Sequence, residues 1–390
     1  MELKAEDRLI LSCVKIQPGA TELDQLNKLI PLVQDWEYLT KNIINRGIGP
    51  LLYKKLPLLT NSSFIPERVK TKLQQAYYKT IGRGTVLQEH FRKVGEAFAA
   101  QCIAVIALKG IYLSEWLYQD IGLRQFSDID LLVKEEDGLK CLSILQELGF
   151  RPFDSGETEF VKSKVEIIHY TPMILNGISI EIHIKLHRNK EKYDLKVDEL
   201  WKNAIPATIN NTPVYALNNY DLLIHLCLHL NKHFRGGHVQ FTCFNDITNL
   251  LDKYSGGIDW IKFIETCRNY NCEAEVFRYI VLVNKYMNAP VPTEIIQQYD
   301  SLLTPNDEKL FFEYLAGKFV PFSAVPQHFG NLGKISSLSD KFKYVWDILF
   351  PSKAFMIQTY KIKRSSRVLL YYPYRYYIGV RGVVNYLFRK

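Results

Sequence analysis

Two aspartates, Asp128 and Asp130, lie two positions apart in the apolar run at residues 128–133 (DIDLLV). Such a run predicts a buried strand, and residues two apart on a strand point to the same face, so we expect the carboxylates to project side by side. Adjacent carboxylates repel, which raises a pKa unless a cation lies between them. Oxygen ligands suit Mg²⁺ or Mn²⁺, so the pair is a candidate metal site. The alternative is a strand with a solvated polar face, and this short motif alone does not exclude it.

A third carboxylate, Glu181, lies in the apolar stretch at residues 178–187 (ISIEIHIKLH), which also predicts a strand. His183 follows two positions later and shares its face. If this strand pairs beside residues 128–133, Glu181 converges with the two aspartates. Three such acids could hold two divalent ions that bridge a triphosphate and an attacking hydroxyl. Taken alone, Glu181 could also be a solvated strand residue.

Two cations and a glycine accompany these acids. Gly110 ends the apolar run at residues 103–108 (IAVIAL), and a glycine lets backbone N–H groups approach phosphate oxygens closely. Lys109 and Arg124 could neutralise phosphate charge, Arg124 in bidentate fashion. Each of the three, taken singly, is more simply explained as an ordinary turn or surface residue.

Short runs of β-branched and apolar residues predict the strands that would position this chemistry. They lie at residues 103–108, 128–133, 159–170 and 178–187, with Asn176-Gly177 as the turn between the last two. Apolar residues at spacings of three and four predict helices up to about residue 100, at 111–120, at 135–150, and in four stretches between 218 and 287. The helix at 135–150 is expected to bury Leu139, Leu142, Leu145 and Leu148. The residues from 188 to 210 carry no clear pattern.

The alternation of strands and helices predicts an α+β fold: a small mixed sheet flanked by N-terminal helices and a C-terminal helical module. A chain of 390 residues is long enough for two or three domains. We expect an N-terminal helical region at 1–100, an α/β core at 101–210, a helical module covering the cleft at 211–330, and a basic, aromatic segment at 331–390.

Five segments together resemble the uncharacterised bacterial nucleotidyltransferase family known as family 5, within the superfamily that has the polymerase-β-like fold. They are LKG at 108–110, R-x-x-S-DIDLLV at 124–133, ELGF at 147–150, IEIH at 180–183 and LLIHLCLH at 222–229. The resemblance covers residues 100 to about 320. The sequence departs from the superfamily pattern in having Gly110-Ile111 where two small residues are usual, and in having Glu181 where Asp is commoner.

The resemblance implies that Asp128 and Asp130 bind Mg²⁺ or Mn²⁺, that Glu181 completes the acidic triad, and that Gly110 and Ser127 lie against the triphosphate of an NTP. It implies an enzyme of the nucleotidyltransferase type, which moves a nucleoside monophosphate to an acceptor hydroxyl or phosphate by attack at the α-phosphate. Lys109 and Arg124 would then offset triphosphate charge.

Three histidines, His225, His229 and His233, recur at a spacing of four and therefore share one helix face. They could bind zinc or line the substrate cleft, but we favour packing over a zinc site because nothing nearby offers soft ligands. In the resembling family this helix belongs to the module over the cleft, which makes His229, like His183, a candidate contact to nucleotide. Asp246 is expected to act as an N-terminal charge on its own helix rather than as a partner of a histidine.

The charge of the chain is unevenly placed. It has 49 Lys and Arg against 41 Asp and Glu, a net +8, but residues 341–390 hold eleven of the cations and one acid, Asp347. Residues 1–340 therefore carry 38 cations against 40 acids, a net −2. A nucleic-acid enzyme more often spreads positive charge over a groove in its body, which argues against a polynucleotide partner.

The basic C-terminal segment also contains thirteen aromatic residues between Phe342 and Phe388. This composition suits an anionic membrane surface, and it suits equally an amphipathic helix docked on the body. No run approaches the 18 or so apolar residues of a spanning helix, and the seven cysteines form no CxxC pair. We therefore expect a cytoplasmic protein that is either free or peripheral at a membrane.

Two rival functions remain open at this point. One is a toxin-like transferase that modifies tRNA or protein, against which the near-neutral body argues. The other is a non-catalytic nucleotide-binding scaffold associated with a membrane or with cell-surface biosynthesis, against which the intact Asp128, Asp130 and Glu181 argue.

Overall fold

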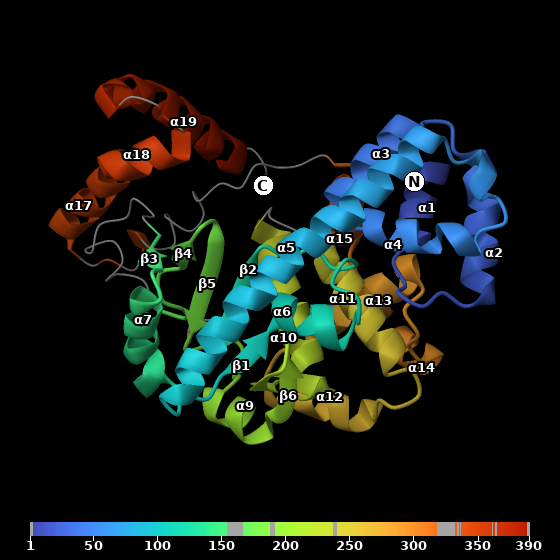
Figure 1. The fold of residues 1–390 in the computed structure, drawn as a ribbon, viewed down its shortest axis with the longest axis horizontal. Coiled ribbons are helices and arrows are strands. Elements are labelled where there is room, and N and C mark those ends of the chain that lie inside the picture. Colours follow the sequence, from blue (N-terminus) through green and yellow to red (C-terminus); the bar gives the residue numbers. More distant parts are fainter. Residues whose placement is uncertain are drawn as a thin grey trace.

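The structure is a computed structural model, which describes residues 3–153, 167–187, 192–236, 240–317, 332–333, 335, 337–360, 362 and 365–387. Its first hundred residues are helical, as the sequence predicts. The helices are α1 (Ala5–Ser12), α2 (Ala20–Leu29), α3 (Trp36–Asn45), α4 (Gly49–Lys55) and α5 (Glu67–Ala100). The long α5 lies across one face of the sheet in Figure 1 and buries a single stripe that includes Leu73, Leu87, Phe91 and Phe98.

The sheet is mixed and has seven strands in the order β3-β4-β5-β2-β1-β7-β6. β2 runs antiparallel to β1 and parallel to β5. The predicted α+β class with a mixed sheet is confirmed. The strands are β1 (Ile106–Leu108), β2 (Asp128–Leu132), β3 (Arg151–Pro152), β4 (Met173–Leu175), β5 (Ile178–His183), β6 (Ile205–Ile209) and β7 (Thr212–Ala216).

Two of these strands, β6 and β7, were not predicted. They form an antiparallel hairpin whose turn, Asn210-Asn211, has positive φ at both residues (46° and 61°), the geometry of the commonest two-residue hairpin turn. Each strand contains a proline, Pro206 in β6 and Pro213 in β7. Proline cannot donate to a strand ladder, so it weakens the sequence signal of a strand and is found mainly at sheet edges, where β6 lies.

The hairpin at Asn176-Gly177 is present, but the strand before it differs from the prediction. The turn residues have φ of 50° and 76°, and they join β4 to β5. Most of the predicted strand at 159–170 lies outside the described residues, which resume at residue 167.

The helix after β2 is α7 (Gly138–Glu147), and the prediction of its buried face is confirmed for Leu145 but wrong for Leu139 and Leu148. Leu139 is 68% exposed, while Cys141, Ile144 and Leu145 are buried. The cause is a close approach at Gly138, where a Cβ would lie 2.4 Å from the ring of Tyr170. This contact rotates the helix so that the face shared by Gly138, Cys141 and Leu145 meets the sheet.

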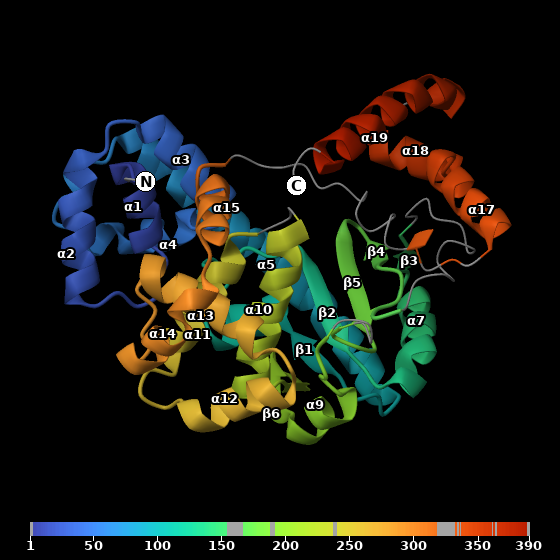
Figure 2. The same ribbon diagram turned by 180° about the vertical axis from the view of Figure 1, so that it is seen from behind.

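The remaining helices of the body lie between and after these strands, and several of those that follow β7 lie beside the N-terminal helices (Figure 2). They are α6 (Lys109–Trp116), between β1 and β2, and then α9 (Val197–Asn203), α10 (Asn219–Gly236), α11 (Thr242–Lys253), α12 (Trp260–Asn269), α13 (Glu273–Met287), α14 (Thr293–Tyr299) and α15 (Pro305–Leu315). One continuous hydrophobic core extends from Leu9 to Leu315. The division of the chain at residues 100, 210 and 330 stays a prediction.

The C-terminal segment forms α17 (Leu338–Leu349), α18 (Lys353–Tyr360), the 3-10 helix η6 (Ser365–Tyr371) and α19 (Tyr372–Leu387). Its buried side chains form two small clusters of their own, one around Ile335 and Tyr344 and one around Met356, Ile362 and Val368. These helices lie together at one end of the molecule (Figures 1 and 2). No helix in the described part of the chain is both long enough and apolar enough to cross a bilayer.

Candidate active site

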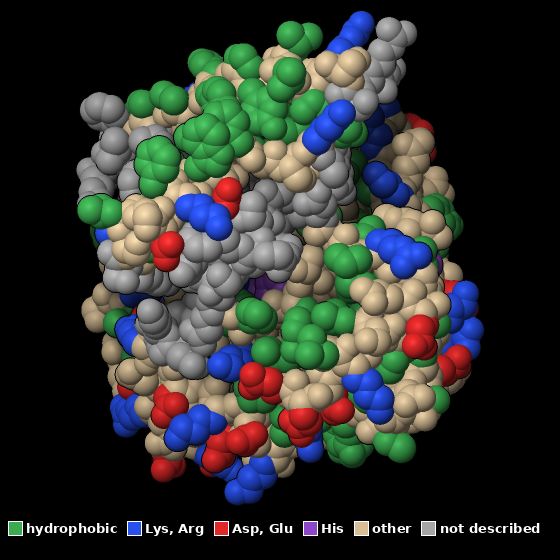
Figure 3. Space-filling view, turned by 90° about the vertical axis from the view of Figure 1, so that its left-hand side faces the viewer, with side chains coloured by type: hydrophobic (Ala, Val, Ile, Leu, Met, Phe, Trp, Pro, Cys, Tyr) green, Lys and Arg blue, Asp and Glu red, His purple; other side chains and the backbone are tan. Residues whose placement is uncertain are grey.

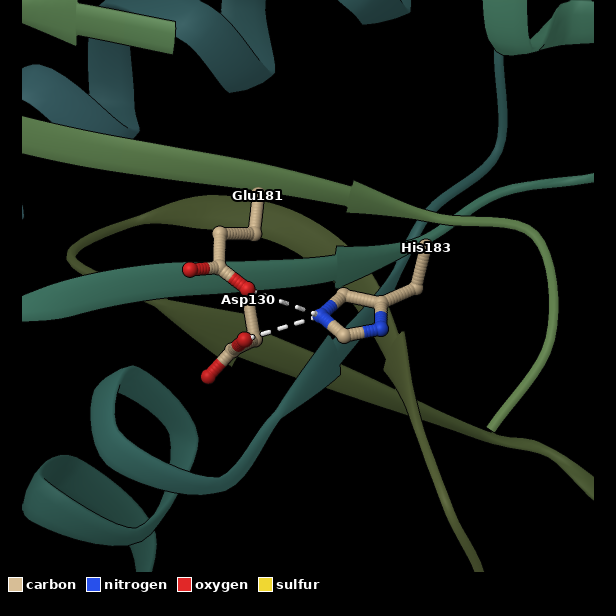
Figure 4. A group of neighbouring side chains, drawn as sticks. All are labelled: Asp130, Glu181 and His183. Atoms are coloured by element: carbon tan, nitrogen blue, oxygen red, sulfur yellow. Dashed lines mark hydrogen bonds and ion pairs between the residues drawn. The ribbon is translucent and has the colours of Figure 1, made fainter. Parts of the chain in front are cut away.

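The parallel pairing of β2 with β5 brings the predicted acids together. In the register, Asp130 lies opposite Glu181, and Asp128 lies opposite Ser179. Opposite residues on neighbouring strands share a face, so the two carboxylates and His183 meet on one side of the sheet (Figure 4). One ligand atom each from Asp130, Glu181 and His183 lies within 4.8 Å of the other two, which is the spacing of a metal-binding group.

Asp130 is the centre of this group. It is buried, and its carboxylate accepts from Lys109 Nζ at 3.0 Å on one oxygen and from His183 Nε2 at 2.9 Å on the other. Burial alone would raise the pKa of Asp130, but Lys109 and His183 outweigh it and hold that pKa well below its usual value. Asp130 is therefore an anion at any physiological pH.

The surroundings of Glu181 shift its pKa in the opposite direction from that of Asp130. Its Oε2 lies 3.7 Å from His183 Nε2 and 4.0 Å from His169 Nδ1. Burial and the charges of Asp130 and Asp128 raise the pKa of Glu181 to about 7. The cluster is thus short of positive charge where this carboxylate lies, and a cation there would favour its ionised form.

Asp128 lies at the start of β2 and is half-buried. Burial and the neighbouring Asp130 raise its pKa, while Lys109 and Arg124 oppose that rise. Asp128 does not belong to the group of three ligand atoms around Asp130; His183, expected only as a nucleotide contact, does. A metal-binding role for Asp128 stays a prediction.

A cavity of about 490 Å³ opens in front of these strands. Seven of the predicted site residues line it: Lys109, Gly110, Arg124, Ser127, Asp128, Asp130 and His229. Glu181 and His183 do not line it, and they adjoin it through Asp130. Seven residues that span 120 positions of the sequence thus surround one cavity.

Lys109 links the acids to the histidine helix. It has a positive φ of 42°, and its Nζ donates to Asp130 and lies 3.2 Å from His229 Nε2. Burial, and then the charge of Lys109, hold the pKa of His229 well below its usual value, so His229 is neutral and accepts at Nε2. Burial would lower the pKa of Lys109, but the aspartates raise it. The ammonium of Lys109 is therefore already engaged by Asp130.

Arg124 is also neutralised by a carboxylate. Its Nε and Nη2 donate to the two oxygens of Asp246 at 2.9 and 2.7 Å, and Tyr118 donates its hydroxyl to the same carboxylate. The expectation that Asp246 acts as an N-terminal charge of its helix is wrong, because Asp246 points from the buried side of α11 to Arg124. A Cβ on Gly110 would lie 3.1 Å from Arg124 Nη1, so this glycine lets the Arg124–Asp246 pair pack beneath the turn.

The three predicted histidines share one face of α10, with ring centroids 6.1 Å apart for His225 and His229 and 4.4 Å apart for His229 and His233. Their environments differ. His225 is buried, and neither of its ring nitrogens has a hydrogen-bond partner among the described residues, whereas His229 and His233 line the cavity. The helix therefore presents two of its histidines to the candidate site.

A family model described as "Uncharacterised nucleotidyltransferase" matches residues 33–288, about two thirds of the chain. The chain belongs to this nucleotidyltransferase family. No curated protein matches it. Among solved structures, the antibiotic-resistance factor ANT(2'')-Ia is similar over 52% of this chain and 98% of its own, at 11% sequence identity and a TM-score of 0.34.

The match to the nucleotidyltransferase family begins at residue 33, earlier than the resemblance from residue 100 had indicated. It thus includes the α3–α4 connection, where Asn45, Arg46 and Gly47 line the cavity. Gly47 has a φ of 72°, and a Cβ there would lie 2.8 Å from Thr242 Cγ2. The sequence signals only a turn between two helices at this point, so its contribution to the site was missed.

Arg46 is the most unusual residue that this connection contributes. Its Nη1 donates to the carbonyl and side-chain oxygens of Asn42, and its Nη2 donates to the carbonyl oxygen of Tyr314. It is buried, and its Nε has no hydrogen-bond partner in the part of the chain that the structure describes. Among the described residues no carboxylate forms an ion pair with Arg46, in contrast to Lys109 and Arg124.

Proposed function

We propose that this chain is a Mg²⁺- or Mn²⁺-dependent nucleotidyltransferase that transfers a nucleoside monophosphate from an NTP to an acceptor hydroxyl or phosphate, with release of pyrophosphate. The proposal combines membership of the nucleotidyltransferase family with one observation. Asp130, Glu181 and His183 converge at the edge of a cavity that Asp128, Gly110 and Ser127 also line.

The donor set fits a divalent cation. Two carboxylates and an imidazole lie within ligand spacing, and the raised pKa of Glu181 marks a place where positive charge is missing. Carboxylate oxygens suit Mg²⁺ and Mn²⁺, and Mn²⁺ also accepts an imidazole nitrogen. Asp130 and Glu181 would hold the ion, with His183 or Asp128 as a further ligand, and the ion would supply charge neutralisation at the phosphate oxygens when bound.

The other roles, which are proton transfer, the ionisation of Asp130 and contact with phosphate, would belong to side chains and backbone groups of the site. Glu181 is placed either to hold the ion or to take the proton of the acceptor, since its pKa of about 7 suits proton exchange near neutral pH. Lys109 keeps Asp130 ionised and ties it to His229. Gly110 and Ser127 line the cavity, and in this proposal their backbone groups approach a phosphate.

The cation that meets the triphosphate is, in this proposal, Arg46 rather than Lys109 or Arg124. Both of the latter are paired with carboxylates, whereas Arg46 lines the same cavity without one. A buried guanidinium that lacks an anion gains more from a phosphate than one that already has a partner. Arg124 then acts on the site by holding α11 against the turn at Gly110.

The test is Mg²⁺-dependent transfer of label from an NTP labelled at its α-phosphate, with an extract fraction supplying acceptors and pyrophosphate release measured in parallel. We expect Asp130→Asn and Asp128→Asn to abolish both signals. Asp24→Asn, which changes an exposed acid of α2, is the matched control and should keep full activity. Full activity in Asp130→Asn would refute the proposal.

A further inference from the structure

One face of α17 is apolar and exposed. Leu338 and Phe342 are 82% and 73% exposed, and the same side continues through Val345, Trp346 and Leu349. These positions follow one another at spacings of three, four and one, which keeps them within one stripe of a helix. A helix that packs on a protein body buries its apolar stripe, so the orientation here is the reverse of the usual one.

The next elements extend this exposed apolar surface. Leu369 and Leu370 of η6 project into solvent, and so do Tyr374, Tyr377 and Ile378 of α19. In Figure 3, hydrophobic side chains gather at the top of the molecule, where the C-terminal helices lie. A patch of this kind is larger than the scattered apolar residues of an ordinary surface and marks a binding site for a protein or a membrane.

The same segment has an inner apolar side that is already satisfied. Tyr344 packs with Ile335, and Met356 packs with Ile362 and Val368. The helices therefore do not need their outer face to stay folded together. The outer face is left for something outside the described chain.

The charge around this face selects among possible partners. Residues 341–390 contain eleven Lys and Arg and one acid. Lys343, Lys353, Arg367 and Arg381 are exposed, one on each of α17, α18, η6 and α19. A second copy of the chain would bring the same positive charge to the same place, which is unfavourable. An anionic surface with an apolar interior complements both properties.

We propose that the C-terminal helices α17, η6 and α19 bind the surface of a membrane that contains anionic lipids. Trp346, Phe342 and Leu338 enter the boundary between headgroups and acyl chains, where aromatic side chains are favoured. The Lys and Arg side chains meet the lipid phosphates, each adding to the attraction at low salt. The chain lies on the membrane and does not span it. This proposal is independent of the nucleotidyltransferase chemistry.

Flotation of the full chain with lipid vesicles tests the proposal. We expect binding to vesicles of phosphatidylcholine mixed with phosphatidylglycerol, weak binding to phosphatidylcholine alone, and release at high salt. The double variant Phe342→Ser/Trp346→Ser should bind about tenfold or more weakly, because it removes two of the largest apolar contacts. Both side chains are exposed, so its thermal unfolding should match that of the wild type.

A matched control removes two equally exposed apolar side chains from the body. Leu139 of α7 and Ile261 of α12 are 68% and 84% exposed, and Leu139→Ser/Ile261→Ser should bind vesicles as the wild type does. Asp130→Asn should also bind normally, which separates this result from the test of catalysis. Equal binding by the two double variants would overturn the proposal. So would a dimer that Phe342→Ser/Trp346→Ser dissociates while vesicles are not bound, since it would assign the face to a second copy.

Discussion

At the scale of single residues, the surroundings of two neighbouring carboxylates, Asp130 and Glu181, shift their pKa values in opposite directions. Asp130 contacts the ammonium of Lys109 and the imidazole of His183, and these neighbours hold its pKa well below its usual value. Glu181, opposite it on β5, lies 3.7 Å from His183 and 4.0 Å from His169, and burial together with the aspartate charges raises its pKa to about 7. The pair therefore differs in charge near neutral pH although both residues are acids of similar intrinsic strength.

This difference predicts a pH dependence of stability. Burial and the aspartate charges raise the pKa of Glu181 from 4.5 to about 7, so the folded state binds its proton more tightly than the unfolded state. The contribution of this proton to the free energy of unfolding is fully present below pH 4.5. It is lost as the pH rises through 7, and its size is on the order of 3 kcal/mol. In EDTA at pH 8, Glu181→Gln should therefore be more stable than the wild type by up to about this amount.

Urea unfolding in EDTA at several pH values measures the effect. The control is Glu136→Gln, which changes an exposed acid just before α7. Its free energy of unfolding should vary with pH as that of the wild type does. Added Mn²⁺ should stabilise the wild type and have a smaller effect on Glu181→Gln, because the variant lacks one ligand. A variant that is less stable than the wild type at pH 8 in EDTA would contradict the charge repulsion assigned to Glu181.

The sequence allowed much of this site to be predicted. Asp128, Asp130, Glu181 and His183 lie on short apolar strands, where a period of two fixes which side chains share a face. It could not show which cations were already paired, because Arg124 and Asp246 are 122 residues apart and only the fold brings them together. Nor could it show that His183 lies close enough to Asp130 to donate to it.

At the scale of elements, close approaches of the backbone decide orientation. Gly138 lies against the ring of Tyr170, where no Cβ would fit, and α7 buries the face that Gly138 shares with Cys141 and Leu145 and leaves Leu139 exposed. The β6–β7 hairpin was missed because its prolines interrupt the strand pattern. Periodicity reports which residues are apolar, but it does not report how near two elements lie.

Helix α5 offers a direct test of such an approach. Gly82 and Gly84 lie two positions apart on it, yet a Cβ at Gly82 would meet nothing within 4 Å, whereas one at Gly84 would lie 2.4 Å from Ile121 Cγ1. We expect Gly82→Ala to stabilise the chain by about 0.5–1 kcal/mol through helix propensity. Gly84→Ala should destabilise it by about 1–3 kcal/mol, because the loop that carries Ile121 toward β2 must move.

Equilibrium urea unfolding of the two variants provides the comparison, with the wild type measured alongside. Each is the control for the other, since the substitution, the helix and the expected gain in propensity are the same. Equal stabilities for the two variants would mean that the loop at Ile121 yields without cost and that α5 does not fix its position.

At the scale of the whole molecule, the cavity is a joint product of distant parts of the chain. Its walls come from the α3–α4 connection, from β2, from α10 and α11, and from Tyr314 of α15. A continuous core underlies all of them. The N-terminal helices are therefore expected to take part in substrate binding, although the sequence motifs of the site begin only at Leu108.

Arg46 makes this expectation testable. If it meets the triphosphate, Arg46→Met should weaken binding of a nonhydrolysable NTP with Mn²⁺ by about tenfold or more, since a charge-assisted hydrogen bond contributes roughly 1.5–3 kcal/mol. Binding of the corresponding nucleoside monophosphate should change much less, and Arg46→Lys should restore part of the NTP affinity. Arg92→Met, on the exposed side of α5, is the control. Isothermal titration gives the affinities and circular dichroism checks the fold; equal losses for mono- and triphosphate in a folded Arg46→Met variant would show that the guanidinium only joins α3 to α15.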